Sequence, residues 1–174
     1  MGEIGAKHNV LFLGSGNAAR SIMAEAILNR EGHDKFCALS AGIQAHVDLD
    51  PHAVALLQKT YFDVTGLRPK AWTELAGAGA PIFDFIFALS DDAALMPQSA
   101  WRGQPIFARW DIPDPARAGG NEAQVQLAYA DVFRMLSNRI GILVNLRLHA
   151  LDRRAIQRQI DGIGKGLASA VAAA

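Results

Sequence analysis

A short apolar run, a glycine-rich loop and a helix-forming run follow one another near the N-terminus and constrain this chain most strongly. Residues 10–13 (VLFL) have the length of a buried strand, and residues 14–17 (GSGN) then interrupt any regular pattern. Residues 23–28 favour a helix. A strand, a loop and a helix in this order turn backbone N–H groups toward one point, at the positive end of the helix dipole. The stretch therefore predicts an anion site, to which Arg20 at the loop–helix junction adds a planar fork of donors.

Length and charge limit the partners that we expect. The 174 residues suffice for one domain with a substantial core. Lys and Arg number 17, as do Asp and Glu, so the charge gives no reason to expect nucleic acid or a membrane surface as a partner. Because no net charge opposes self-association, we expect a monomer or a weak homodimer.

Neither a membrane-spanning run nor a secretion signal is visible in the sequence. No apolar run approaches the ~18 residues that a membrane helix needs, and no basic segment followed by an apolar one begins the chain. Cys37 is the only cysteine, so no internal disulfide points to secretion. We expect a cytoplasmic protein in which Cys37 is a small buried residue of the second strand.

Strands alternate with helices up to residue 110. We predict strands at residues 9–13, 35–40, 83–89 and 105–109, and helices at residues 21–30, 51–60, 72–75 and 92–96. The second of these helices has a clear start, because Asp50 is a good N-cap and Pro51 suits the first helical position. The alternation predicts a parallel sheet with helices on both faces.

The rest of the chain is helical in pattern. We predict a helix at residues 122–148, with Gly141 as a weak point, and another at residues 151–171. In the second helix apolar residues recur every three to four positions, but several glycines each cost roughly 1 kcal/mol relative to Ala. These glycines are Gly162, Gly164 and Gly166. The apolar stripe predicts docking onto the chain's own core, and a dimer contact is the alternative.

Two other interpretations of the glycine loop are open. Residues 14–19 (GSGNAA) fit the G-x-G-x-x-A dinucleotide fingerprint, after a strand and before a helix. That hypothesis needs an acidic residue at the end of the second strand to bind the ribose hydroxyls, where this chain has residues 39–42 (LSAG). The stretch also fits a glycine turn that only packs a strand on a helix. It is not a Walker loop, because the required Lys is missing.

Three stretches together match a known family. Residues 10–26 (VLFLGSGNAARSIMAEA) run from an apolar strand through a mid-loop Asn to Arg and Ser, residues 40–42 are SAG, and residues 110–115 are WDIPDP. In these motifs the chain resembles the low-molecular-weight protein-tyrosine phosphatases and the arsenate reductases built on the same fold. It looks closest to the arsenate-reductase-like bacterial branch, and the resemblance covers residues 9–148.

The resemblance implies an α/β fold of three layers. A four-stranded parallel sheet in the strand order 2-1-3-4 would carry helices on both faces. We expect residues 1–150 to form this phosphatase-like domain and residues 151–174 to add a helical C-terminal extension to it. We expect neither a cofactor nor a bound metal.

The resemblance also implies a role for each residue of the loop. Arg20 would bind the oxyanion with two donors, and Ser21 would hydrogen-bond the family's nucleophile and stabilise its thiolate. Asn17 would hold the shape of the loop, which suits its tolerance of a left-handed backbone. Asp114 would protonate the leaving oxygen, with Asp111 as the competing candidate. The N–H groups that complete the cradle belong to Ser15, Gly16, Asn17, Ala18, Ala19 and Arg20.

Gly14 stands where the family has its nucleophilic Cys. Because glycine has no side chain, no covalent phospho- or arseno-enzyme forms there. We expect the side chain of Ser15 to point away from the cradle and to have no adjacent base. Reductases of this fold need further cysteines, and residues 90–98 (SDDAALMPQ) carry no sulfur that could be oxidised to a disulfide.

We therefore hypothesise a catalytically inactive protein that binds phosphate, arsenate or sulfate in the loop, either free or on a phosphorylated protein. An active tyrosine phosphatase or arsenate reductase of this family is one alternative. A dinucleotide-binding enzyme is another.

Two smaller signals have open interpretations. Ligand-type side chains alternate through residues 46–52 (HVDLDPH), as the ligands of a metal on an extended chain would, but Asp50 is also explained as an N-cap. Asp91 and Asp92 fit the start of a short helix. They also fit a pair of carboxylates that screens anions from the mouth of the loop.

Overall fold

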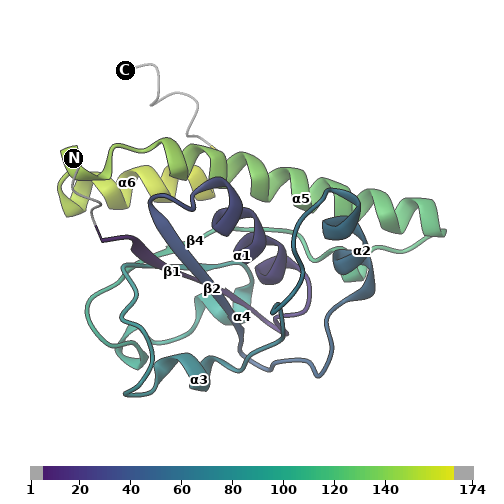
Figure 1. Cartoon of the computed structure of the whole chain (residues 1–174), viewed down its shortest axis with the longest axis horizontal. Helices are drawn as coiled ribbons and strands as arrows, with labels where there is room; N and C mark the ends of the chain where they lie inside the picture. The colour runs from purple at the N-terminus through teal and green to yellow at the C-terminus, as the bar shows by residue number, and fades with distance from the viewer. Residues whose placement is uncertain (1–5, 167–174) are drawn as a thin grey trace.

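The computed structural model describes residues 6–166, and a four-stranded parallel sheet lies at its centre (Figure 1). The strands are β1 (His8–Gly14), β2 (Phe36–Gly42), β3 (Phe85–Ala88) and β4 (Ile106–Arg109). Their order is β2-β1-β3-β4, and every neighbouring pair is parallel. The predicted fold class and strand order are therefore confirmed.

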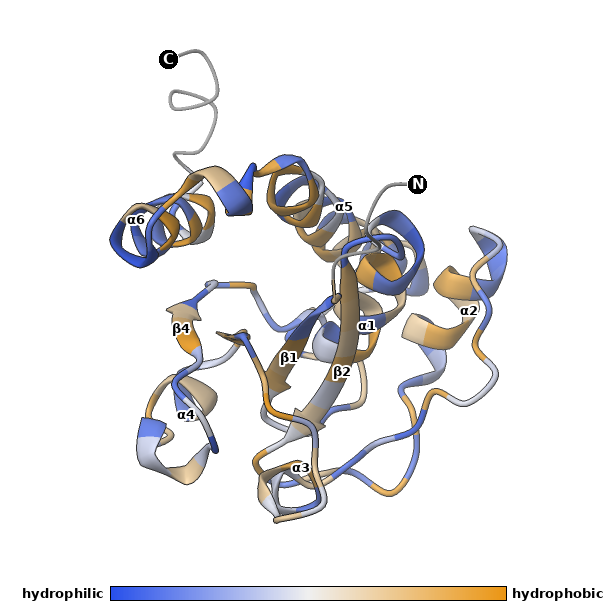
Figure 2. Cartoon of the chain, turned by 60° about the vertical axis from the view of Figure 1, so that its left-hand side comes forward, coloured by the Kyte–Doolittle hydropathy of each residue, from blue (hydrophilic) through white to orange (hydrophobic). Residues whose placement is uncertain are grey.

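Helices cover both faces of the sheet. One face carries α1 (Arg20–Glu31), α2 (Pro51–Lys59), α5 (Glu122–Asn145) and α6 (Arg153–Gly164), and the other carries α3 (Trp72–Ala76) and α4 (Asp91–Ala94). Single 3-10 turns lie at Gln98–Ala100, Pro115–Arg117 and Leu148–Ala150. In Figure 2 hydrophobic and hydrophilic residues alternate along α5, as expected for a helix with one buried face. Among the described residues no helix is both long and apolar enough to cross a membrane.

The central strands alternate between two hydrophobic clusters. Val10 and Phe12 of β1 pack with the helices on the α1 side, whereas Leu11 and Leu13 pack on the α3 side. All four side chains are fully buried. This alternation follows from the two-residue period of a strand, so a sheet covered on both faces needs an apolar residue at every position.

Two strand lengths differ from the prediction because pairing, rather than composition, sets them. β1 and β2 run on together as far as Gly14 and Gly42, which are paired with each other. β3 is shorter than predicted, although Asp84 and Leu89 at its ends each still donate one backbone hydrogen bond to β1.

The prediction that Cys37 is buried is wrong, because its side chain is exposed. Its neighbours Phe36 and Ala38 point into the core on the α1 side, so Cys37 points to the opposite face. On that face, at this edge of the sheet, a bridge between Gly42 and Ala71 leads into α3, and it lies at the other end of β2. Cys37 thus lies on a part of an edge strand that nothing covers.

The C-terminal helices differ from the prediction in their ends. α5 continues through Gly141 without a break and ends at Asn145 rather than at residue 148. Leu127, expected on its apolar stripe, is 62% exposed. The predicted helix at residues 151–171 is observed as Arg153–Gly164, and Leu167 and Val171 of its stripe lie outside the described residues.

α6 docks on the chain's own core, as the apolar stripe predicts. Ile160 and Ile163 are buried, and the indole Nε1 of Trp110 donates a hydrogen bond to the carbonyl of Ile160 at 3.1 Å. A Cβ on Gly164 would lie 2.4 Å from the carbonyl oxygen of Arg109 and 2.8 Å from the indole ring. The glycine that the sequence marks as a weakness is therefore what lets α6 approach β4.

We expect Gly164→Ala to lower the free energy of unfolding by about 1–3 kcal/mol, because the new methyl group overlaps a backbone carbonyl that has no room to move. Urea unfolding followed by tryptophan fluorescence measures the effect. Gly162→Ala is the matched control, since a Cβ there meets nothing within 4 Å and is expected to be neutral or to stabilise by up to ~1 kcal/mol. Equal losses in both variants would show that α6 does not depend on this close approach.

Candidate functional site

The carbonyl groups of the loop between β1 and α1 are held by the segment that follows β2. The bonds are Ile43 N to Gly14 O (3.0 Å), Gln44 N to Ser15 O (2.8 Å), His46 N to Gly16 O (2.8 Å) and Asp50 N to Ala18 O (3.0 Å). All peptide bonds described are trans, so each N–H points away from the carbonyl of the same peptide unit. Most amides of the loop therefore face away from this segment. In the described part of the chain, the N–H groups of residues 15–20 donate to no acceptor.

These free donors line a small cavity at the carboxyl end of the sheet. Its volume is about 90 Å³, well above the roughly 10–15 Å³ that one water needs, and residues 14–21 form most of its wall. The other lining residues are His46, Asp50, Asp114 and Ala116. A larger cleft of about 780 Å³ shares Ser15, Arg20 and Asp114 with it. The arrangement suits a small anion with an approach from the cleft.

Arg20 is fixed at the start of α1 by backbone carbonyls from two distant loops. Its Nη1 donates to the carbonyls of Leu89 at 3.2 Å and Ile112 at 3.0 Å. Its Nη2 lies 3.6 Å from Oδ2 of Asp114, and the side chain is 12% exposed. Within the described residues Nε has no hydrogen-bond partner, so the Nε–Nη2 edge of the fork is the part that an oxyanion would meet.

The structure places Asp114, rather than Asp111, beside Arg20. Oδ1 of Asp114 accepts a bond from Ala116 N at 3.1 Å, and Oδ2 faces the guanidinium groups of Arg20 and Arg117 at 3.6 and 3.7 Å. Asp111 instead pairs with Arg109 at 2.6 Å and lines only the larger cleft.

Asn17 links the loop to the interior of the protein. Its φ of 51° is left-handed, as the sequence suggests for this residue. Its Nδ2 donates to the hydroxyls of Ser21 and Ser40, each at 2.8 Å, and its Oδ1 accepts from the backbone N of Lys70 at 2.8 Å. With an exposed fraction of 2%, the side chain is effectively part of the core.

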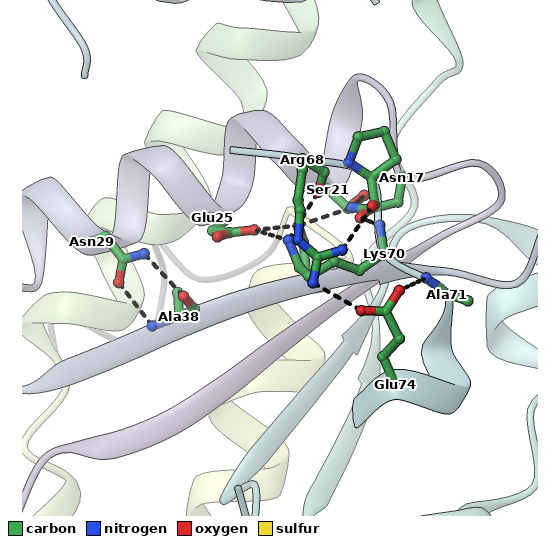
Figure 3. A network of polar contacts seen from close by, with 11 residues as sticks. Asn17, Ser21, Glu25, Asn29, Ala38, Arg68, Lys70, Ala71 and Glu74 are labelled. Carbon is green, nitrogen blue, oxygen red and sulfur yellow. Dashed lines mark hydrogen bonds and ion pairs between the residues drawn. The ribbon is translucent and has the colours of Figure 1, made fainter. Parts of the chain in front are cut away.

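A buried ion pair continues this network away from the loop (Figure 3). The hydroxyl of Ser40 donates to Oε2 of Glu25, and Nζ of Lys70 lies 3.4 Å from the same oxygen. The side chains of Glu25 and Lys70 are 9% and 8% exposed. Nζ also donates to the carbonyl of Arg68 at 3.0 Å, so the ammonium group has two acceptors. The loop is thus supported from below by charged groups that are almost inaccessible to water.

Glu25 and Lys70 were not among the predicted site residues. Nothing in the local pattern marks either one, because they are 45 residues apart in the chain and meet only in the folded core. Gly42 was quoted only as the end of a motif. A Cβ there would lie 2.9 Å from the carbonyl carbon of Gly16 and 3.0 Å from Asn17 N, so only glycine lets β2 pass this close to the loop.

Gly14 ends β1 at the floor of the cavity. A Cβ at this position would stand 3.0 Å from Oγ of Ser21. Any side chain at residue 14 would therefore contact the Ser21 hydroxyl at the first turn of α1.

Ser15 differs from its prediction in one respect: it has an acidic neighbour. Its hydroxyl donates to Oδ1 of Asp92 at 2.7 Å. Partial burial raises the pKa of Asp92, but hydrogen bonds from Ser90, Ser15 and the amide of Ala93 outweigh it, so the pKa lies below its usual value. The carboxylate is therefore a weak base and a poor activator of Ser15. Asp91 and Asp92 begin α4 as expected, and Asp92 also lies at the mouth of the larger cleft.

The alternating side chains of residues 46–52 do not form a metal site. Asp50 caps α2 by accepting bonds from His52 N at 2.9 Å and Ala53 N at 3.2 Å. Its other oxygen accepts from the hydroxyl of Tyr129 at 2.6 Å, and burial together with this bond raises the pKa of Tyr129. Among the residues that the structure describes, no three His, Cys, Asp or Glu side chains are grouped closely enough to hold a metal ion.

Comparison with known proteins gives one family throughout. The family model of low molecular weight phosphotyrosine protein phosphatases matches residues 9–157. The arsenate reductase of Bacillus subtilis (strain 168) is 30% identical over 135 residues, which cover 75% of this chain and 91% of the reductase. The crystal structure of an arsenate reductase from Archaeoglobus fulgidus is similar with a TM-score of 0.63 and 26% identity, covering 79% of this chain and 99% of that one. Vibrio vulnificus Wzb in complex with benzylphosphonate shares the fold, with a TM-score of 0.61, 20% identity and coverage of 80% and 98%. The chain thus belongs to the low molecular weight phosphotyrosine protein phosphatase family.

Proposed function

We propose that this protein binds a tetrahedral oxyanion in the loop of residues 14–21 and does not turn it over. The ligand is phosphate, arsenate or sulfate, either free or on a phosphorylated protein. The observation that carries the proposal is the row of N–H groups of residues 15–20, which have no acceptor among the described residues and lie beside the fixed fork of Arg20. The Bacillus subtilis relative is, by name, a protein that acts on such an anion.

The missing nucleophile supports the second half of the proposal. Gly14 offers no group for covalent catalysis, and the low pKa of Asp92 leaves Ser15 without an effective base. Uncatalysed hydrolysis of phosphate monoesters is so slow that enzymes accelerate it by up to ~10²¹-fold, which anion positioning alone does not supply. Asp114 keeps the place of a general acid beside Arg20, but it has no attacking group to assist.

Arsenate reduction is disfavoured by the position of the single cysteine. Cys37 pairs with Asn9 near the start of β1, whereas the loop follows Gly14 at the end of the same strand. A thiol at the opposite end of the sheet does not reach an anion held by the loop. The family's reductase chemistry therefore has no sulfur in this site.

The expected affinity is moderate. Charge-assisted hydrogen bonds each contribute roughly 1.5–3 kcal/mol before the cost of binding, which places dissociation constants in about the micromolar to millimolar range. We propose a cytoplasmic monomer or weak homodimer that uses no cofactor and takes neither nucleic acid nor a membrane as partner. The balance of 17 basic and 17 acidic residues supports this.

Arg20→Ala is expected to weaken phosphate and arsenate binding by roughly 10- to 100-fold, because it removes the charged donors from the site. Isothermal titration calorimetry at fixed ionic strength measures both anions. Arg158→Ala is the matched control, since Arg158 is an exposed arginine on α6, far from the loop in the fold. Absence of binding to the wild-type protein, or equal affinity of wild type and Arg20→Ala, would sink the proposal.

A further inference from the structure

The hydroxyl of Ser21 is buried with an unused proton. Its oxygen accepts a bond from Nδ2 of Asn17 at 2.8 Å, and its exposed fraction is 1%. Within the described part of the chain, the hydroxyl donates to no acceptor, although every other side chain of the network has its donors engaged. A buried donor without an acceptor is unfavourable, so this proton is available to a ligand.

The space in front of Ser21 is the space that a side chain of residue 14 would fill. An ideal Cβ on Gly14 has only Oγ and Cβ of Ser21 within 4 Å, at 3.0 and 3.5 Å, apart from its chain neighbours. Both residues line the cavity of about 90 Å³ that the loop encloses. An acceptor atom lying against the Cα of Gly14 is therefore within reach of the hydroxyl at the 2.7–2.8 Å typical of O–H···O bonds.

Given the oxyanion binding proposed above, on which this step rests, we infer that the ligand is a free tetraoxyanion with one oxygen in the space beside Gly14. That oxygen accepts the hydrogen bond of Ser21, while the other oxygens meet the N–H groups of the loop and the open edge of Arg20. The floor of the cavity thus becomes a fourth oxygen subsite, which exists because residue 14 is glycine.

A phosphate monoester fits this subsite less well than the free anion. With its organic group directed into the cleft of about 780 Å³, the phosphorus face turned toward Gly14 carries no oxygen, and Ser21 keeps its unused proton. If the ester turned an oxygen toward Ser21, the tetrahedral geometry would swing its organic group from the mouth toward the wall formed by His46 and Asp114. The free anion meets neither problem, because every corner of the tetrahedron is an oxygen.

The test compares inorganic phosphate with phenyl phosphate by isothermal titration calorimetry. Wild type is expected to bind inorganic phosphate at least about 10-fold more tightly than phenyl phosphate. Gly14→Ala, whose methyl group takes up part of the subsite, and Ser21→Ala, which removes the donor, are each expected to weaken phosphate binding about 10-fold. Both should leave phenyl phosphate within about twofold. Gly77→Ala is the control, because a Cβ at this exposed glycine meets nothing within 4 Å.

The outcomes separate this inference from the proposed function. If wild type binds no anion, the proposed function itself fails. If anions bind and depend on Arg20, but Gly14→Ala weakens both ligands equally or neither, the fourth subsite is wrong while the proposed function stands. Gly14→Ala leaves Ser21 and Asn17 in place, so it decides the matter even if Ser21→Ala disturbs the loop through its bond to Asn17.

Discussion

Gly14→Cys is expected to hydrolyse p-nitrophenyl phosphate at least ~10³-fold faster than wild type, because the substitution supplies the one group that the site lacks. The new Cβ would lie 3.0 Å from Oγ of Ser21, which is tight enough to require a shift of a few tenths of an ångström in that side chain. The unused proton of Ser21 would then stabilise the thiolate. Arg20 and Asp114, 3.6 Å apart, already hold the positions of the anion clamp and the acid.

The controls for this experiment vary one group at a time. Gly14→Ser is expected to remain inactive, since a hydroxyl without a base is a poor nucleophile. Adding Arg20→Ala or Asp114→Ala to Gly14→Cys is expected to remove the new activity. The opposite result, wild-type hydrolysis of aryl phosphate that disappears in both Arg20→Ala and Asp114→Ala, would show that the protein is an active phosphatase by another route.

Lys70→Met is expected to lower the free energy of unfolding by about 3–5 kcal/mol, because it leaves the carboxylate of Glu25 buried without its partner. Denaturant unfolding at pH 7 measures the loss. The exposed Lys59 at the end of α2 offers a matched control, and Lys59→Met is expected to change the free energy of unfolding by less than about 0.5 kcal/mol.

A second variant identifies the cause of that loss. The double variant Lys70→Met with Glu25→Gln removes both charges and is expected to be more stable than Lys70→Met alone, since no unpaired ion is left in the core. If the two are equally unstable, the loss comes from packing of the lysine side chain and not from its charge. Anion affinity of the double variant then reports whether Asn17 still holds the loop through Ser40.

The buried pair also explains how a loop with unused donors keeps its shape. Oε2 of Glu25 accepts the Ser40 hydroxyl, Ser40 accepts the amide of Asn17, and Asn17 in turn binds the Lys70 backbone. The contacts form a closed circuit from the loop to the ion pair and back. The N–H groups of the loop are therefore held open by groups that lie outside the cavity.

Much of the fold was predictable because its signals are local. The alternation of strands and helices and the N-cap at Asp50 are read from neighbouring residues, and the structure confirms them. The strand order and the relation of Asp114 to the loop came from the resemblance to a family. Exposure was less predictable: Cys37 and Leu127 look like core residues in sequence, but whether another element covers a position depends on how the elements pack.

The sequence by itself determined that a strand, a glycine loop and a helix with Arg20 form an anion cradle whose nucleophile position is Gly14, because these features lie within one short stretch. Only the tertiary structure decided what holds that cradle. Arg20 meets the carbonyl of Ile112 across 92 residues, and Glu25 meets Lys70 across 45. Contacts at such separations leave no periodic pattern along the chain, because they arise only when the core excludes water and brings the partners together.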